Sequence, residues 1–241
     1  MTLSGDCVHG YKMEDNTDCA GAEDLTSTLA AASATYGKVN KGYNVTSSST
    51  YLRGNDTTTF QWLHNGSDFS ISIWVRQDTS TTSTSHAIMG STRGGDVRGI
   101  IWRMLGQLVS FTIARSSPYP ALSGIWTTAL PASTHDYFHL VITYDDSADE
   151  MKLYVNNVVN GTTASRTNAC QVGTQDQYLT VGTNKVSGTL QPLLDYMDEA
   201  YFFTTVLTQA NVNTLWNGGN GLTYPFLVTD TENAVFTSMN F

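Results

Sequence analysis

The chain has 241 residues, of which 40% are hydrophobic and 14% are charged, and its formal net charge at pH 7 is −9. This length and apolar content are sufficient for one domain with a sizeable core. The acidic charge argues against nucleic-acid binding as a main role, because it repels a phosphate backbone. No stretch of the sequence is long and apolar enough to predict insertion into a membrane.

The N-terminal residues and the cysteines bear on where the protein works. The opening MTLSGDCVHGYKMEDN has no positively charged start followed by an apolar core, so we expect no secretory signal peptide here. A domain of this size does not need disulfides, which favours free thiols at Cys7, Cys19 and Cys170. A bridge between Cys7 and Cys19 across a short loop remains the alternative.

Alternating apolar and polar residues predict strands through the first half of the chain. Short strands are predicted at residues 8–14, 41–45 and 50–54. The strictest alternation is FSISIWVRQ at residues 69–77, with one face made by Phe69, Ile71, Ile73 and Val75 and the other by Ser70, Ser72, Trp74 and Arg76. After a polar connection, three further strands are predicted at residues 87–91, 98–105 and 108–116.

The second half begins with an irregular segment and ends with a helix. Residues 116–136 hold three of the five prolines, which predicts a surface loop. Residues 139–145 and 151–157 are predicted as a hairpin, and residues 178–184 and 197–203 as two more strands. Thr208 is a suitable N-cap for a short helix that ends at Gly218 and carries Val212, Leu215 and Trp216 on one face.

Six phrases in this order carry a resemblance to a known family. They are GYKMED, GKVNKGYNV followed by TYLRG, FSISIWVR, HLVITYD with MKLYVN, LDYMDEAYFF and TQANVNTLWNGGNG. Together they resemble a laminin-G-like domain of the concanavalin A-like lectin/glucanase superfamily. The resemblance implies an all-β fold, a jelly-roll β-sandwich of two antiparallel sheets with a short helix near the C-terminus.

One domain is therefore expected over residues 1–241. The resemblance covers about residues 8–226, which we expect to form the core of the domain. Residues 227–241 then form a C-terminal tail, which we expect to dock as a strand, either in the domain itself or on a neighbouring subunit.

The superfamily includes glycoside hydrolases, in which two carboxylates flank the scissile bond. An E-x-D-x-E pattern on one strand is absent from this sequence. The adjacent pairs Asp149-Glu150 and Asp198-Glu199 do not replace it, because neighbouring residues on a strand point to opposite faces. We therefore predict that the chain is not an enzyme.

Glycan binding needs exposed aromatic rings to stack on sugars and polar groups to bond the hydroxyls. The candidate aromatic residues are Trp102, Tyr119 and Trp126, and the candidate polar residues are Arg98 and Asp96. Packing offers an alternative for each ring: Trp102 as a buried sheet residue, and Tyr119 and Trp126 as anchors of the loop.

Calcium is the cofactor that the resemblance implies, held by carboxylate and backbone oxygens. Asp198 is the best candidate ligand, and Glu14 and Asp6 would lie nearby if the first and last strands are neighbours. The alternative is that Asp198 or Glu199 caps a loop or accepts backbone hydrogen bonds.

Three functions remain open from the sequence. The first is a non-enzymatic display module on a virion surface, which decorates a capsid or tail and contacts cell-surface glycans, other virion proteins or copies of itself. This hypothesis combines the missing signal peptide with the known occurrence of such domains in viruses that infect bacteria. The second is a secreted, calcium-dependent carbohydrate-binding or adhesion domain, working outside the cell. The third is a purely structural oligomeric module.

Overall fold

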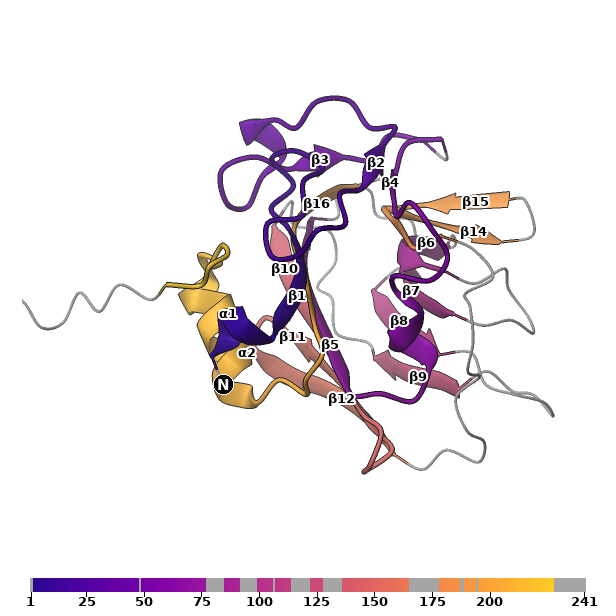
Figure 1. Ribbon diagram of the computed structural model, residues 1–241, viewed down its shortest axis with the longest axis vertical. Coiled ribbons are helices and arrows are strands. Elements are labelled where there is room, and N and C mark those ends of the chain that lie inside the picture. The colour runs from indigo at the N-terminus through magenta and orange to yellow at the C-terminus, as the bar shows by residue number, and fades with distance from the viewer. Residues whose placement is uncertain are drawn as a thin grey trace, which may run out of the picture.

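The computed structural model describes residues 2–47, 49–76, 85–91, 99–105, 107–113, 122–127, 136–164, 178–186, 189–193 and 195–227. Two antiparallel β-sheets pack face to face, and one α-helix covers the outer face of the first. Figure 1 shows this helix and the two sheets as three successive layers. The predicted all-β jelly-roll sandwich is confirmed.

The first sheet, called sheet A, has the strand order β1-β16-β5-β10-β11-β12, and β3 also pairs with β16. Its strands are β1 (Cys7–Tyr11), β3 (Tyr43–Asn44), β5 (Phe69–Arg76), β10 (Tyr137–Asp145), β11 (Glu150–Val155), β12 (Val158–Ala164) and β16 (Tyr196–Phe203). The first and last strands, β1 and β16, are neighbours, as the sequence predicted.

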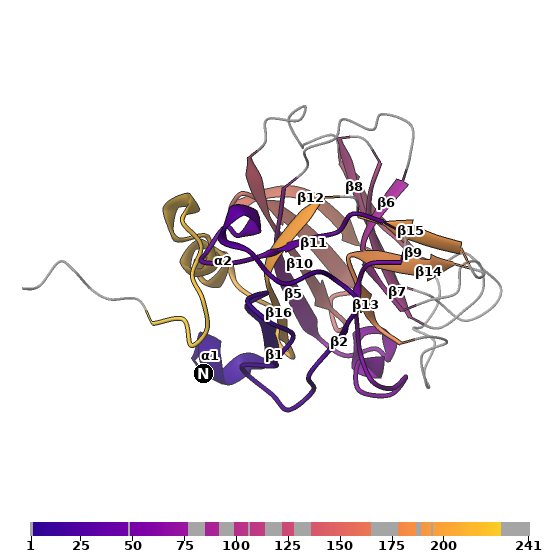
Figure 2. The same cartoon turned by 90° about the horizontal axis from the view of Figure 1, so that it is seen from above.

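The second sheet, called sheet B, has the strand order β2-β4-β13-β6-β7-β8-β9. Its strands are β2 (Thr26–Ser27), β4 (Leu52–Arg53), β6 (Ser85–Gly90), β7 (Ile100–Leu105), β8 (Leu108–Ile113), β9 (Leu122–Thr127) and β13 (Thr180–Val181). A hairpin of β14 (Thr183–Val186) and β15 (Thr189–Pro192) lies on the side of sheet B away from the helix (Figure 2).

Strand β9 corrects the prediction for residues 116–136. That segment was expected to be a loop because of its prolines, but Leu122–Thr127 pairs with β8 as the last strand of sheet B. The prolines of the segment stand at 118, 120 and 131, outside the strand, so the ladder of hydrogen bonds loses no donor to them.

The helices are short. In the described ranges, the α-helices are α1 (Leu3–Asp6) and α2 (Gln209–Trp216), and the 3₁₀ turns are η1 (Ala34–Tyr36), η2 (Gln61–His64) and η3 (Asn217–Gly219). Among the described residues, none of the helices has the length and apolar content needed to cross a membrane.

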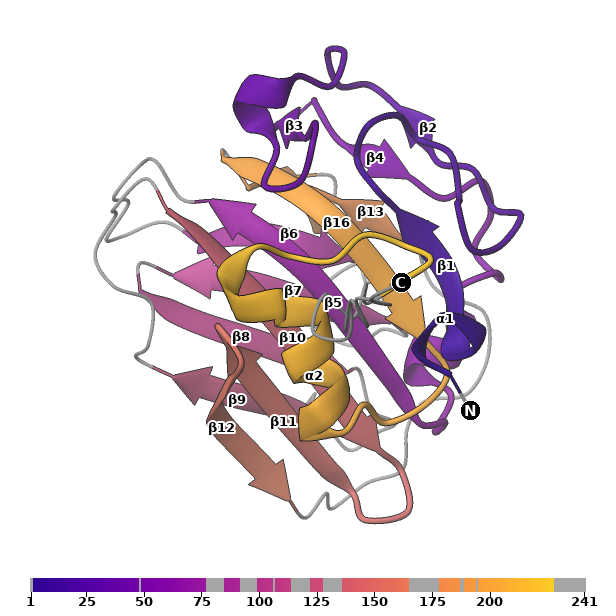
Figure 3. The ribbon, with the colours of Figure 1, turned by 90° about the vertical axis from the view of Figure 1, so that its left-hand side faces the viewer.

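The alternation predicted for β5 is confirmed, and it explains the layering. Phe69, Ile71, Ile73 and Val75 lie in the core between the sheets. Ser70, Ser72 and Trp74 on the other face are buried as well, because α2 lies across that face of sheet A (Figure 3). A second apolar cluster joins the helix to the sheet through Val141, Tyr201, Phe203, Val212 and Leu215.

The ends of α2 match their sequence signals. The Thr208 hydroxyl accepts the N–H of Asn211, and the Asn211 side chain accepts the N–H of Thr208, so the two residues form a capping box. The helix ends at Asn217 in a left-handed conformation, followed by Gly218 and Gly219 with positive φ. The predicted helix is therefore confirmed at both ends.

Candidate functional site

The predicted glycan residues are not brought together as one exposed site in the described part of the chain. Trp102 on β7 is completely buried and meets Phe111 edge to face, with ring centroids 5.7 Å apart. Its predicted role in stacking on a sugar is wrong, because its ring lies in the core between the sheets. Trp126 lies on β9, opposite Ser110 of β8 in the strand register. Tyr119, Arg98 and Asp96 fall outside the described residues.

The predicted calcium ligands are not gathered either. Asp198 is completely buried, and its Oδ2 accepts the backbone N–H groups of Lys38 and Val39, each at 2.7 Å. Its Oδ1 accepts the N–H of Glu199 at 2.9 Å. This arrangement is the alternative in which Asp198 accepts backbone hydrogen bonds.

The two other predicted calcium ligands, Glu14 and Asp6, do not form a metal-binding group with Asp198. Glu14 accepts a hydrogen bond from the Asn40 side chain at 2.9 Å, and Asp6 is the last residue of α1. Within the described ranges, no group of three or more His, Cys, Asp or Glu residues is placed to hold a metal ion. A calcium site built from Asp198, Glu14 and Asp6 does not fit this geometry. Calcium binding through other ligands stays a prediction.

A different set of side chains meets at one end of sheet A. The strand register places Asn44 of β3 opposite Tyr196 of β16, Tyr196 opposite Arg76 of β5, and Arg76 opposite Tyr137 of β10. Residues directly opposite each other in antiparallel strands share a face of the sheet. Because Arg76 follows core-facing Val75, this row lies on the outer face, and all four residues are partly exposed.

Aromatic rings surround the guanidinium group of Arg76. Its Cζ lies 3.9 Å from the centroid of the Tyr196 ring and 5.8 Å from that of Tyr137. Tyr36, the last residue of η1, places its ring on that of Tyr196, with centroids 5.2 Å apart and planes inclined by 34°. The Tyr137 hydroxyl donates a hydrogen bond to the Tyr36 carbonyl oxygen. We call Tyr36, Tyr137, Tyr196 and Arg76 the tyrosine platform.

A second aromatic group continues the platform along β5. The Nζ of Lys38 lies 4.9 Å above the ring of Trp74, two residues from Arg76 on the same face. Trp216 at the end of α2 stacks on Trp74, with centroids 5.2 Å apart and planes inclined by 12°. Trp74 itself is buried, so Lys38 and Trp216 are the partly exposed members of this second group beside the platform.

Two buried carboxyl groups, Asp198 and Glu199, follow Tyr196 on β16. Burial, together with the charge of Glu199, raises the pKa of Asp198 to about 9, although three N–H donors oppose the shift. Burial also raises the pKa of Glu199 to about 7, and its Oε2 accepts the hydroxyl of Tyr201.

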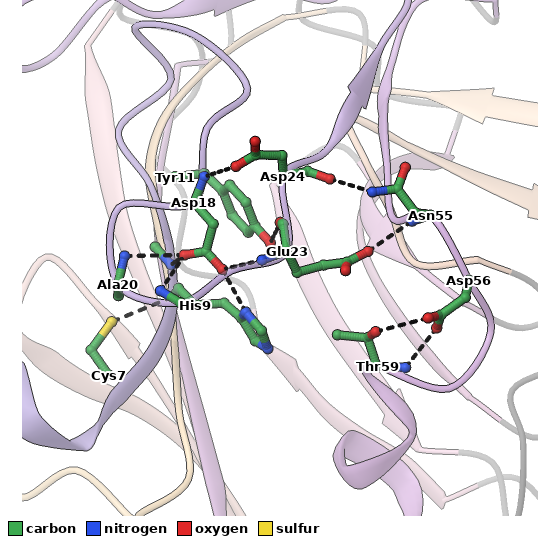
Figure 4. Close-up of polar contacts among 12 residues, drawn as sticks. Cys7, His9, Tyr11, Asp18, Ala20, Glu23, Asp24, Asn55, Asp56 and Thr59 are labelled. Atoms are coloured by element: carbon green, nitrogen blue, oxygen red, sulfur yellow. Dashed lines mark hydrogen bonds and ion pairs between the residues drawn. The ribbon is translucent and has the colours of Figure 1, made fainter.

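The N-terminal loop contains another buried carboxylate, but it serves the loop itself (Figure 4). Asp18 accepts backbone N–H groups from Gly10, Ala20, Gly21 and Glu23 at 2.8 to 3.1 Å. It also bonds the His9 Nδ1 at 2.7 Å. Burial acts to raise the pKa of Asp18, but these hydrogen bonds outweigh it and lower the pKa to about 2. Both oxygens are therefore occupied, and Asp18 organises the loop.

The thiols of the same region are free. Cys7 and Cys19 form no disulfide, which agrees with the prediction that favoured free thiols. Burial raises the pKa of Cys19 to about 11 and raises that of Cys7 further. Neither group is therefore a reactive thiolate at neutral pH.

The signal for the platform in the sequence is weak. Its residues lie on four separate elements, and Tyr36 and Tyr137 are 101 positions apart. The usable signal is that Arg76 lies near the end of the predicted strand 69–77 and that Tyr196 directly precedes the predicted strand 197–203. Antiparallel pairing of those strands brings such ends together.

Comparison with known proteins gives a family and a fold. Residues 44–213 match the family model of the concanavalin A-like lectin/glucanases superfamily. No curated protein sequence matches the chain.

Solved structures with a similar fold include binding domains of botulinum neurotoxins. One is the binding domain of botulinum neurotoxin DC in complex with SialylT, with a TM-score of 0.65, 14% identity, and coverage of 90% of this chain and 52% of that chain. Another is of botulinum neurotoxin type C, whose cell entry depends on interaction with two ganglioside molecules, with a TM-score of 0.67, 14% identity, and coverage of 90% and 52%. A third is the serotype C1 binding domain, with a TM-score of 0.67, 14% identity, and coverage of 90% and 53%. The chain spans about half the length of these structures, and at such identities the likeness concerns the fold alone.

Proposed function

Because the chain belongs to the concanavalin A-like lectin/glucanase superfamily, we propose that it is a non-enzymatic carbohydrate-binding domain whose ligand stacks on the tyrosine platform. The observation that carries this proposal is the gathering of three partly exposed tyrosine rings: Tyr137 and Tyr196 lie beside the Arg76 guanidinium, and Tyr36 packs on Tyr196. Sugar rings have apolar C–H faces that pack on aromatic rings, and hydroxyls that bond to nearby polar groups.

Cell-surface glycans are the class of ligand that we propose. All four platform residues are partly exposed, so they are accessible to the terminal sugars of a glycan chain. Asn44, in the same row of the sheet, offers an amide for sugar hydroxyls. Botulinum neurotoxin type C, which is similar in fold, interacts with gangliosides, and this makes ganglioside oligosaccharides suitable first probes.

The absence of catalysis is part of the proposal. Asp198 and Glu199, which follow Tyr196 on β16, are completely buried, and Asp198 is bonded to backbone N–H groups. Glycoside hydrolysis needs two carboxyl groups that reach the scissile bond. We therefore propose binding without hydrolysis. Virion display, calcium dependence and location outside the cell stay predictions from the sequence.

Binding to an array of ganglioside and neutral cell-surface oligosaccharides tests the proposal. We expect the wild-type chain to bind a subset of the array, and Tyr196→Ala to lower that affinity about tenfold, equivalent to about 1.4 kcal/mol. Tyr196→Phe keeps the ring and should keep most of the affinity.

Tyr178→Ala is the matched control. Tyr178 is 39% exposed and stacks with Arg53 at 4.8 Å, so it repeats the tyrosine–arginine pair beside sheet B, outside the platform. Its loss should leave binding unchanged. Equal losses in Tyr178→Ala and Tyr196→Ala, or an array to which the wild-type chain does not bind, would contradict the proposal.

A further inference from the structure

The ring of Tyr36 reaches the platform from a tightly closed loop. Ser33 and Gly42 exchange two backbone hydrogen bonds of 3.0 and 3.1 Å, which join the ends of residues 33–42. Inside this loop, a Cβ at Gly42 would collide with the Tyr36 carbonyl oxygen. We call residues 33–42 the Tyr36 loop.

One buried side chain ties the Tyr36 loop to sheet A. The Oδ2 of Asp198 accepts the N–H groups of Lys38 and Val39, which follow Tyr36 almost directly, although Asp198 is 160 and 159 positions away from them. Asp198 stands two residues after Tyr196 on β16, and so on the same face of the sheet. The same strand therefore supplies one ring of the platform and the anchor for the loop that supplies another.

The second oxygen fixes the side chain itself. Oδ1 of Asp198 accepts the N–H of Glu199, at a point where β16 bulges away from β5 and Glu199 adopts a positive φ of 50°. The bulge and this local hydrogen bond hold the carboxyl group toward the loop. Both oxygens are thus used to position backbone, and neither is directed at a ligand.

We propose that Asp198 is a positioning residue for the ligand site: its hydrogen bonds to Lys38 and Val39 hold Tyr36 against Tyr196, and the platform binds its glycan only with the loop held this way. This inference rests on the proposed function of the platform. Without Asp198, the Tyr36 ring loses its fixed place although every ring of the platform is still present.

A second buried aspartate provides the matched control. Asp18 also accepts several backbone N–H groups and also pins a loop, but that loop covers residues 18–24 and contributes no residue to the platform (Figure 4). Asp18→Ala and Asp198→Ala each remove a buried carboxylate that organises backbone. They differ in whether the released loop carries a platform ring.

The experiment combines affinity with amide hydrogen exchange at pH 7. The probe is a ganglioside oligosaccharide in solution, used with the wild-type chain, Asp198→Ala, Asp198→Asn and Asp18→Ala. We expect Asp198→Ala to lower the affinity about tenfold or more and to speed the exchange of amides in residues 33–42. Asp198→Asn keeps one acceptor oxygen and should restore part of the affinity. Asp18→Ala should lower stability and leave the affinity within about twofold of wild type.

Several outcomes separate the alternatives. Equal losses of affinity in Asp18→Ala and Asp198→Ala would overturn the inference, because general destabilisation would then explain both. A loss that appears in calcium and disappears in chelator would also overturn it, because Asp198 would then act through a metal ion.

The two proposals can fail separately. The wild-type chain could bind none of the oligosaccharides while Asp198→Ala still speeds exchange only in residues 33–42. In that case Asp198 does hold the Tyr36 loop, but the proposed function fails. If Asp198→Ala does not fold, hydrogen exchange in the wild-type chain tests the inference instead. Oligosaccharide binding must then slow the exchange of the Lys38 and Val39 amides, and unchanged exchange at these amides would contradict the role proposed for Asp198.

Discussion

The pKa values of two buried aspartates, Asp18 and Asp198, are shifted in opposite directions, because the surroundings of the two carboxyl groups differ. Asp18 has five hydrogen-bond donors and its pKa falls to about 2. Asp198 has three donors and a neighbouring carboxyl group, and its pKa rises to about 9. Donors stabilise the charged form, whereas burial and like charge oppose it.

Acid unfolding should depend on Asp18. Its pKa in the folded chain, about 2, lies below its ordinary value of 3.8, so its contribution to stability is present above about pH 4 and is lost as the pH falls through about 2. The shift corresponds to about 2 kcal/mol. We expect Asp18→Asn to lower the free energy of unfolding by about this amount at pH 7 and by much less near pH 2. Urea unfolding of both chains at several pH values measures the difference; parallel curves for the two chains would contradict it.

Trp102 provides a test of the corrected assignment. Because its ring is completely buried against Phe111, Trp102→Ala should lower the free energy of unfolding by about 3–5 kcal/mol. Chemical denaturation measures this effect. At temperatures where the variant is folded, its affinity for array glycans should equal that of the wild-type chain. A variant of unchanged stability that no longer binds glycans would restore the original prediction.

Helix α2 shows how a short element is defined by its ends. Thr208→Ala removes the hydroxyl of the capping box and should lower the free energy of unfolding by about 1 kcal/mol. Thr214→Ala is the control on the same helix, because the Thr214 hydroxyl only bonds back to the Ala210 carbonyl oxygen. Alanine is the better helix former there, so stability should stay equal or rise slightly. Thermal unfolding monitored by circular dichroism compares the two variants.

The elements that were predicted correctly from the sequence are those whose signals lie within one short stretch of the chain. Helix α2 has an N-cap and a glycine stop, and β5 alternates without a break. Strand β9 was missed because prolines nearby suggested a loop, while its pairing with β8 is a contact between distant segments. The platform was missed for the same reason, since Tyr36, Tyr137 and Tyr196 meet only through sheet register and the fold of one loop. Trp102 was predicted as a glycan-binding residue because strand alternation alone does not tell whether its ring faces the core or the solvent.

At the scale of the whole molecule, sheet A is buried on both sides. Its inner face packs against sheet B in the main core, and its outer face packs against α2 in the second cluster. Helix α2 covers only part of the outer face (Figure 3). The tyrosine platform lies on the same face, where Arg76 follows two residues after Trp74, the residue on which Trp216 at the end of the helix stacks. The fold therefore supplies a rigid support for the platform and leaves the rings accessible.

This layering predicts an order of local opening. Strands β5 and β10 pair with strands on both sides and contribute to the main core, and β10 also supplies Val141 to the second cluster. Helix α2, by contrast, contributes only to the second cluster. Backbone amides of β5 and β10 should therefore exchange hydrogen only through global unfolding, and those of α2 through a smaller opening that leaves the sandwich intact.

Substitutions in the two clusters test this order by hydrogen exchange and mass spectrometry. Leu215→Ala removes an apolar contact of α2 and should speed exchange in residues 209–216 far more than in β10. Ile73→Ala, in the main core, should speed exchange in both regions, because it lowers the stability of the entire sandwich. If Leu215→Ala accelerated β10 and α2 equally, the helix and the sheets would open as one unit. The platform would then depend on α2 for its support, and Leu215→Ala would weaken glycan binding as strongly as Asp198→Ala.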